Sequence, residues 1–296
     1  MPYKSSYIIF ILLYFSAHIQ LNAQKNSYSA LPTTDFIYSP DLLTYISPSA
    51  QVLSNQYMVN IKYASYIGLR KVMNETYFDA WYRLKEKKGL SFGLQLYNNN
   101  QGPFIHLNNI KLLSRYLLNL NYKYNLCLGM GLGAISYNFD SNDKNAGGAD
   151  AAPDADVGLS IQSKKVNAGI SLKSLIDRTV NPIEVNYRKN FLSNIYFSKE
   201  WQNNPDYKLR TSLVGTYFIY SKSVTNDYFV EAFYKKNLKL IALLYHYQTF
   251  GYGFGLENIE TPIGNLGFNL LYSNGLGNSV VISSERYEIG IKYFFK

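Results

Sequence analysis

Cysteine is almost absent from this sequence: Cys127 is the only one among 296 residues. A single thiol cannot form an internal disulfide, and it cannot supply the clustered cysteine ligands that hold structural zinc. Histidine is nearly as scarce, because beyond the first 23 residues only His106 and His246 remain. These shortages exclude a disulfide scaffold and the common cysteine- and histidine-rich metal centres.

Charged side chains are also few, at 17% of the chain, against about a quarter in a typical soluble domain. The net charge is nevertheless +9. The basic residues are scattered singly, with short clusters only at 85–88 and 235–236. A nucleic-acid-binding protein gathers its basic side chains into a patch or stripe. We therefore expect no nucleic-acid partner.

Long hydrophobic runs are missing as well. After the first 23 residues the longest apolar run is 240–245, which is far short of the ~20 residues that a membrane-spanning helix needs. A mature chain of this kind can cross a membrane only as a closed β-barrel, because lipid cannot satisfy open backbone groups.

The first residues carry the pattern of an export signal. Lys4 precedes the unbroken apolar run 8–15, and Leu21-Asn22-Ala23 ends in a small residue. This arrangement predicts a signal peptide over residues 1–23, cleaved between Ala23 and Gln24. An N-terminal membrane anchor is the alternative, but the apolar run is too short to span a bilayer.

Aromatic residues and strict alternation are what the sequence has in abundance, with 29 Tyr and 17 Phe. In the final segment, every second residue from Tyr287 to Phe295 is apolar, while Glu288, Gly290 and Lys292 lie between them. A repeat of two places these sets on opposite faces of a β-strand. The same alternation recurs from about residue 51 to the end.

Turn-forming residues divide the alternating region into segments of strand length. They predict fourteen strands, an even number, as single-chain bacterial barrels have: 51–66, 74–86, 88–98, 105–119, 123–139, 154–162, 165–173, 190–203, 207–220, 225–236, 238–247, 248–258, 262–273 and 281–295. The mature chain, 24–296, is thus predicted to be one all-β domain, a transmembrane antiparallel β-barrel. Its irregular N-terminal segment, 24–50, is expected to plug or cap the periplasmic end. Loops are predicted at 141–153 and about 177–190.

A soluble β-sandwich or propeller would show the same alternation, because one face of each strand is then buried. Two features favour the barrel. Aromatic residues gather at the strand ends, as in a membrane girdle. The last strand also ends in aromatic residues, Tyr293-Phe294-Phe295, with only Lys296 beyond them. These features predict an outer-membrane location.

Glycine occupies every second position in 129–133 and in 251–255. A phosphate-binding glycine loop follows a strand and opens a helix, and neither segment has that context. Here the glycines fall on the face opposite the apolar residues, where they thin the wall or let a strand bend. The two segments therefore predict no cofactor site.

Catalytic and metal-binding residues are equally hard to assemble. A nucleophilic hydrolase would pair a serine with one of the two histidines, and Ser91 and Ser114 are possible partners, but no spacing marks a triad. Five aspartates around the loop 141–153 offer oxygen ligands for calcium. Their spacing does not match an EF-hand, and a solvated acidic loop is favoured: Asp140, Asp143, Asp150, Asp154 and Asp156. We expect no catalytic residue, no metal site and no enzyme.

Six charged side chains fall on the non-apolar face of their predicted strands, and this face would line the interior of a barrel. Charges of both signs can pair inside a narrow barrel or line a water path, and the sequence leaves both readings open. These candidate lumen charges are Asp79, Arg83, Arg115, Glu231, Glu288 and Lys292.

The order of these segments resembles the PorP/SprF family of outer-membrane proteins, which is associated with type IX secretion and gliding motility in Bacteroidetes. The likeness covers most of the mature chain, and its motifs are strand-and-turn patterns rather than catalytic residues. It is carried by residues 78–83, 89–94 and 100–103, by 122–131, 153–159 and 167–172, and by the closing segment 287–293. The chain departs from the family after the signal peptide, where 47–50 replaces the usual Asn-Pro-Ala-like motif, and at 283–286.

The resemblance implies a role in anchoring or secretion. A barrel of this family would bind a secreted surface adhesin or other type IX cargo with a C-terminal sorting domain, work with type IX components, and contact outer-membrane lipid. A passive porin or small-solute transporter is the alternative. Conductance distinguishes the two, because a porin needs a continuous water path.

Overall fold

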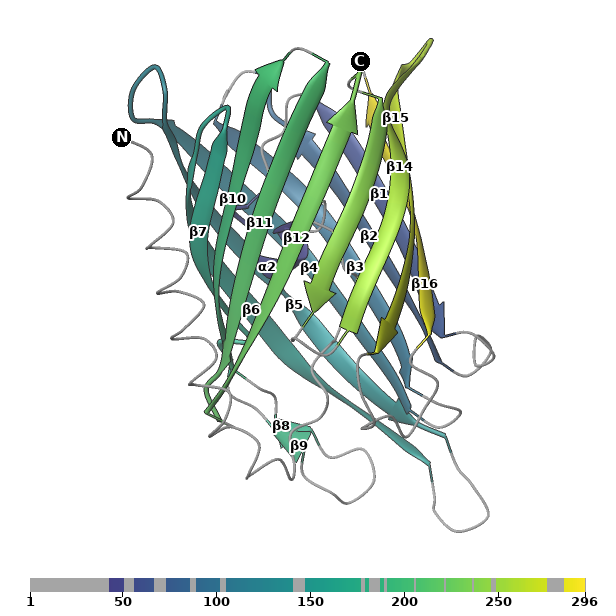
Figure 1. Ribbon diagram of the computed structural model, residues 1–296. Coiled ribbons are helices and arrows are strands. Elements are labelled where there is room, and N and C mark those ends of the chain that lie inside the picture. Colours follow the sequence, from purple (N-terminus) through teal and green to yellow (C-terminus); the bar gives the residue numbers. More distant parts are fainter. Residues whose placement is uncertain are drawn as a thin grey trace.

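The computed structural model describes residues 43–50, 56–66, 73–85, 89–101, 105–140, 147–176, 179–180, 187–188, 191–204, 206–220, 222–235, 237–245, 249–275 and 285–295. Within these ranges, fourteen antiparallel strands form one closed barrel (Figure 1). Its strands are β1 (Tyr57–Tyr66), β2 (Met73–Arg83), β3 (Leu90–Gln101), β4 (Ile105–Asn119), β5 (Asn125–Phe139), β6 (Gly148–Gln162), β7 (Val166–Lys173), β10 (Leu192–Asn204), β11 (Tyr207–Phe218), β12 (Ser223–Tyr234), β13 (Leu238–Tyr245), β14 (Thr249–Thr261), β15 (Gly264–Gly275) and β16 (Arg286–Phe295).

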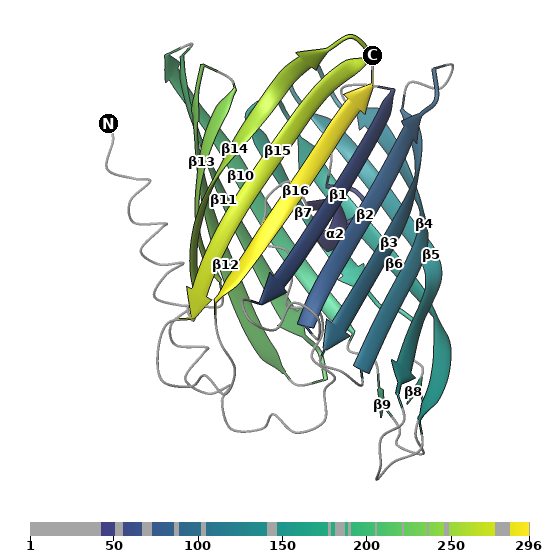
Figure 2. The same ribbon diagram turned by 90° about the vertical axis from the view of Figure 1, so that its right-hand side faces the viewer.

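The barrel closes where the last strand pairs with the first. Tyr57 lies opposite Phe295 and Tyr66 opposite Arg286, so that β16 lies beside β1 in Figure 2. Every other barrel strand pairs with its neighbour in the chain, and β7 pairs with β10 across the connection that holds β8 (Thr179–Val180) and β9 (Tyr187–Arg188). Closure leaves no long open edge for lipid to meet, which is the condition for a membrane-spanning sheet.

All fourteen predicted strands have a counterpart in the barrel, but the start of β6 was predicted wrongly. The sequence predicted a loop over 141–153, whereas β6 begins at Gly148 and pairs with β5 from the Phe139–Gly148 match onward. Small residues make this stretch resemble a loop, and only the β5 neighbour identifies it as a strand. The predicted irregular region after β7 also contains the short pair β8–β9.

The two faces of the wall are inverted relative to those of a soluble protein. On β4, Ile110 and Leu112 are 51% and 69% exposed, whereas the intervening Lys111 is 2% exposed. The same arrangement holds around the barrel, with apolar side chains outside and polar ones inside. A soluble sandwich buries its apolar faces, so this arrangement fits a wall that faces lipid.

The two ends of the barrel differ in their connections. At the end where β1 begins and β16 finishes, the strands are joined by short segments such as 163–165, 205–206 and 262–263. At the other end the connections include 174–191 and 276–285. Outer-membrane barrels have short periplasmic turns and long extracellular loops, which assigns the first end to the periplasm and the second to the cell exterior.

A single helical turn, α2 (Leu43–Ile46), lies within the ring of strands (Figures 1 and 2). It belongs to the N-terminal segment 24–50, of which residues 43–50 are described. In the described part of the chain, no helix is both long and apolar enough to cross a membrane.

Candidate functional site

Residues 45–50, which we call the plug segment, occupy the interior of the barrel. Ser47, Ser49 and Ala50 are each completely buried. The segment turns back on itself, since the Ala50 amide donates to the Ser47 carbonyl at 3.1 Å. The Ser47 and Ser49 hydroxyls also hydrogen-bond to each other at 2.9 Å. A turn of buried polar backbone inside a barrel needs partners on the surrounding wall.

Inward-facing side chains of the wall supply those partners by donating to plug carbonyls. The Ser160 hydroxyl and the Gln162 amide both bind the Ser49 carbonyl, at 2.8 and 2.7 Å. Three further plug carbonyls receive bonds of 2.5 to 2.7 Å, which run from Asn167 to Ala50, from Ser171 to Ile46 and from Lys173 to Tyr45. These donors come from β6 and β7, so one side of the wall holds the plug segment by its backbone.

Two glycines make room for the plug segment on the same side. Gly129 of β5 and Gly158 of β6 lie directly opposite each other in the ladder. A Cβ on Gly129 would stand 2.5 Å from both the Pro48 carbonyl carbon and the Ser49 amide nitrogen. Gly158 faces the Ser47 hydroxyl in the same way. The alternation in the sequence placed the glycines of 129–133 on the inner face. The structure shows that the absence of a side chain at Gly129 leaves room for the backbone of the plug segment.

Apolar contacts fix the plug segment against the rest of the wall. The Tyr45 ring lies 5.7 Å from that of Tyr77 and 5.5 Å from that of Tyr97, and the Lys173 ammonium stands 3.8 Å from the Tyr45 ring centroid. On the opposite side, Ile46 and Ala50 pack in a buried cluster contributed by strands β10 to β13 and β15: Tyr196, Val214, Phe229, Ile241, Leu243 and Leu271. The plug segment therefore bridges two sides of the barrel.

Charged side chains fill other parts of the interior as paired clusters. Lys111 lies 2.8 Å from Asp154 and 2.5 Å from Asp156. Arg286 lies 3.2 Å from Glu75 and 3.3 Å from Glu288. Glu231 binds Arg210 and Lys239, both at 3.2 Å. Buried charges need such partners, because an unpaired one in a dry interior is costly.

The six candidate lumen charges lie on the inner face but do not form one site. Glu231 and Glu288 belong to the clusters just described. Asp79 is fully buried and accepts from the Trp81 indole at 2.8 Å, and the Arg115 guanidinium stacks on the same indole with its central carbon 4.7 Å from the ring centroid.

The remaining two, Arg83 and Lys292, are half-buried. Arg83 is the last residue of β2, and Lys292 lies 4.8 Å from the Phe294 ring. The six charges are thus distributed among several local contacts along the interior.

Sequence reasoning missed Lys111, Lys239 and Arg286, the cations at the centre of these clusters. Alternation places Lys111 between Ile110 and Leu112 on the opposite face of its strand, and this signal could have identified it as an inward charge. The favoured reading of Asp154 and Asp156 as part of a solvated acidic loop is wrong, since both are buried against Lys111. Asp140, in contrast, is exposed and pairs with His106 at 3.1 Å.

Other predicted positions lie beyond the described residues: the cleavage pair Ala23 and Gln24, His246 and Asp143. Of the histidines, only His106 is described, and its ring hydrogen-bonds to Asn100 at 2.7 Å. Within the described ranges, no group of three or more histidine, cysteine or acidic side chains is arranged to hold a metal ion.

Comparison with known proteins places this geometry in context. Residues 34–293 match the family profile described as type IX secretion system membrane protein PorP/SprF. No curated protein matches the chain.

Several solved barrels share the fold. The toluene transporter TbuX of Ralstonia pickettii is 10% identical, with a TM-score of 0.52 over 94% of this chain and 98% of that one. The P. putida toluene transporter TodX is 9% identical, with a TM-score of 0.52 over 93% and 97%. The CymD monoaromatic hydrocarbon channel is 10% identical, with a TM-score of 0.50 over 93% and 96%. These likenesses extend to the fold alone.

Proposed function

The chain belongs to the PorP/SprF family of type IX secretion system membrane proteins, and we propose that this outer-membrane barrel binds or anchors a secreted surface protein. The family implies association with type IX secretion components. The finer assignment, a cargo of the adhesin type with a C-terminal sorting domain, is our proposal. It includes no catalytic step and no cofactor.

The plug segment is the observation that carries this proposal over the passive-pore alternative. Its backbone is held by Ser160, Gln162 and Asn167, and its side chains pack against both halves of the wall. A passive porin needs a water-filled channel. A barrel that fills its lumen with its own chain and with paired charges is better suited to act as a rigid platform.

The extracellular end offers a surface for such a partner. Residues 131–139 of β5 pair with 148–156 of β6, whereas the β6–β7 ladder begins only at Val157. This stretch of β5 and β6, which we call the blade, reaches the lower end of Figure 1. It extends past the ladder with β7 on one side, while β4 pairs with its other side as far as the Ile105–Phe139 match. Its outer face includes the exposed, small residues Ala149, Ala151 and Pro153. A surface formed by uncharged side chains suits the centre of a contact with a folded protein, where charged residues are depleted.

Affinity purification of the tagged barrel from detergent-solubilised outer membranes tests the proposal. We expect recovery of a large secreted protein that carries a C-terminal sorting domain, identified by mass spectrometry. The double variant A149R/A151R places two charges on the blade, and it should lower that recovery about tenfold, equivalent to ~1.4 kcal/mol.

Asn274→Arg is the matched control, because Asn274 is an exposed residue at the extracellular end of β15. The control should retain the partner at the wild-type level. Recovery of no secreted protein and no type IX component, from membranes in which the barrel is folded, would contradict a platform role.

A further inference from the structure

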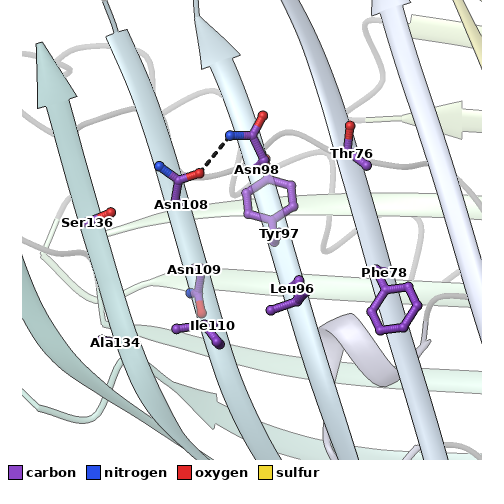
Figure 3. Close-up of a pocket in the computed structure, with 10 residues that line it drawn as sticks. All are labelled: Thr76, Phe78, Leu96, Tyr97, Asn98, Asn108, Asn109, Ile110, Ala134 and Ser136. Carbon is purple, nitrogen blue, oxygen red and sulfur yellow. Dashed lines mark hydrogen bonds between the residues drawn. The ribbon is translucent and has the colours of Figure 1, made fainter.

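The outer wall of β2 to β5 contains a groove that the platform role does not use. Its volume is about 390 Å³, within the roughly 300–1,000 Å³ of small-molecule sites. Figure 3 shows its lining from outside the barrel. The residues that line it are Thr76, Phe78, Leu96, Tyr97, Asn98, Asn108, Asn109, Ile110, Ala134 and Ser136.

Strand register divides the groove into an apolar row and a polar row. Phe78, Leu96, Ile110 and Ala134 lie opposite one another across the four strands. A row of polar side chains lies two positions further along each strand, toward the cell exterior. It consists of Thr76, Asn98, Asn108 and Ser136. The groove therefore straddles the outer boundary of the apolar belt, where a bound molecule would have one end in lipid and the other in water.

The two asparagines at the mouth form a paired hydrogen-bonding unit. The Asn98 amide donates to the Asn108 carbonyl oxygen at 2.7 Å. This bond leaves the Asn98 side-chain carbonyl oxygen as an acceptor and the Asn108 side-chain NH2 group as a donor. In Figure 3 these two groups point away from each other. A hydroxyl both donates and accepts, so neighbouring hydroxyl groups match this unit.

Charge narrows the class of ligand. Three rows of outward side chains surround the mouth, including the next row outward, Asn74, Asn100, His106 and Asn138. Among these described positions the only titratable side chain is His106, which pairs with Asp140. Phosphate recognition relies on Arg or Lys, and none is present in the three rows. A neutral head group fits this mouth better than a phosphorylated one.

We propose that this groove binds a glycolipid: its neutral sugar hydroxyls bond to Asn98 and Asn108, and its acyl chain lies on Leu96 and Ile110. The amphipathic floor argues for the lipid rather than a free sugar. Ala134, the smallest side chain of the apolar row, leaves the space that the chain enters. The groove borders the blade, because Ser136 lies opposite Ala151, so the two proposals are separated by their probes rather than by their positions.

Native mass spectrometry of the purified barrel tests the proposal with three probes: dodecyl maltoside, dodecylphosphocholine and free maltose. The barrel is held in lauryldimethylamine oxide, and each probe is added in turn. We expect one maltoside to be retained per barrel, and both other probes to be retained about tenfold less, because each lacks one half of the contacts.

Two variants locate the site. N98L/N108L removes the paired amides, and Ser136→Phe fills the groove from its far side; each should lower maltoside retention about tenfold. Asn274→Leu is the control outside the groove and should retain the probe. A heat-modifiability shift on electrophoresis confirms that each variant is folded.

If N98L/N108L and Ser136→Phe retained dodecyl maltoside as well as the wild-type barrel does, the proposed site would be overturned. If the wild-type barrel retained dodecylphosphocholine as well as dodecyl maltoside, the preference for a neutral head group would be overturned. If it retained free maltose equally well, the requirement for an acyl chain would be overturned. None of these outcomes depends on recovery of a secreted partner, so the two proposals fail separately.

Discussion

Gly129 and Gly158 show how single residues determine what the lumen can hold. Both face inward, and both lie against the plug segment at distances that leave no space for a Cβ. Neither position requires glycine for its backbone conformation, because both are ordinary strand residues. The requirement is for close approach of a second backbone, one of the recognised reasons for glycine within a strand.

Gly129→Ala should therefore destabilise the barrel by pushing against the Pro48–Ser49 backbone. Overpacking of this kind costs about 1–3 kcal/mol, and urea unfolding in micelles would report it as a lower midpoint. Gly267→Ala is the matched control, because the nearest atom to its Cβ would be 3.7 Å away. Equal stability of the two variants would show that the plug segment does not press on this wall.

The inward position of the Gly129 segment could be predicted from alternation, but its partner could not. The plug segment and its donors are far apart in the chain: Ser49 and Ser160 differ by 111 positions. Asp154 and Asp156 were misjudged for a similar reason, because their partner Lys111 is 45 residues from Asp156. Local patterns fix which face a side chain occupies, and only closure of the barrel decides what it meets there.

At the scale of elements, the strand β6 extends past its ladder with β7, which begins only at Val157, and residues of this extension bind or lack backbone donors. The Leu175 amide donates to the Ala155 carbonyl at 2.9 Å, which shows that odd-numbered residues of β6 turn their backbone groups toward this edge. The Ala151 amide is bound by the Asp150 carboxylate at 2.7 Å. Pro153 has no amide hydrogen. Because the Ala151 N–H is already bound and Pro153 has none, this edge offers few free donors to a strand of another molecule, which discourages association.

D150A/P153A should unmask this edge by releasing the Ala151 amide and restoring an N–H at position 153. We expect the purified variant to form dimers or larger species through edge pairing, seen as a rise in mass by light scattering coupled to size exclusion. Asp140→Ala, just after β5 on the same hairpin but away from the outer edge of β6, should stay at the wild-type mass. An unchanged mass for D150A/P153A would mean that other features keep the edge apart.

Element boundaries were the least predictable part of the fold. The fourteen strands follow from alternation, because one face of each must be apolar to meet lipid. The first residues of β6 do not alternate in this way: Ala149, Ala151 and Ala152 are all small, and Pro153 resembles a turn residue. These positions lie on the blade, outside the part of the wall that faces lipid, so their outer face need not be strongly apolar.

At the scale of the whole molecule, the polar interior and apolar exterior identify a barrel in lipid, and the contents of the interior decide its role. The plug segment joins the two halves of the wall through Tyr45 on one side and Ile46 on the other. Buried ion pairs, such as those of Lys111 and Arg286, occupy other parts of the barrel interior. The proposal of a surface for partners, rather than a path for solutes, rests on this packing of the interior.

Planar-bilayer recording of the purified full-length barrel tests this account most directly. We expect no steady ohmic channels from the wild-type protein, and we expect channels to appear in a variant that lacks residues 24–50. Loss of the segment removes the backbone that Ser160, Gln162 and Lys173 hold across the lumen. Steady ohmic conductance from the wild-type barrel would contradict the closed lumen, and with it the case for a partner platform over a passive pore.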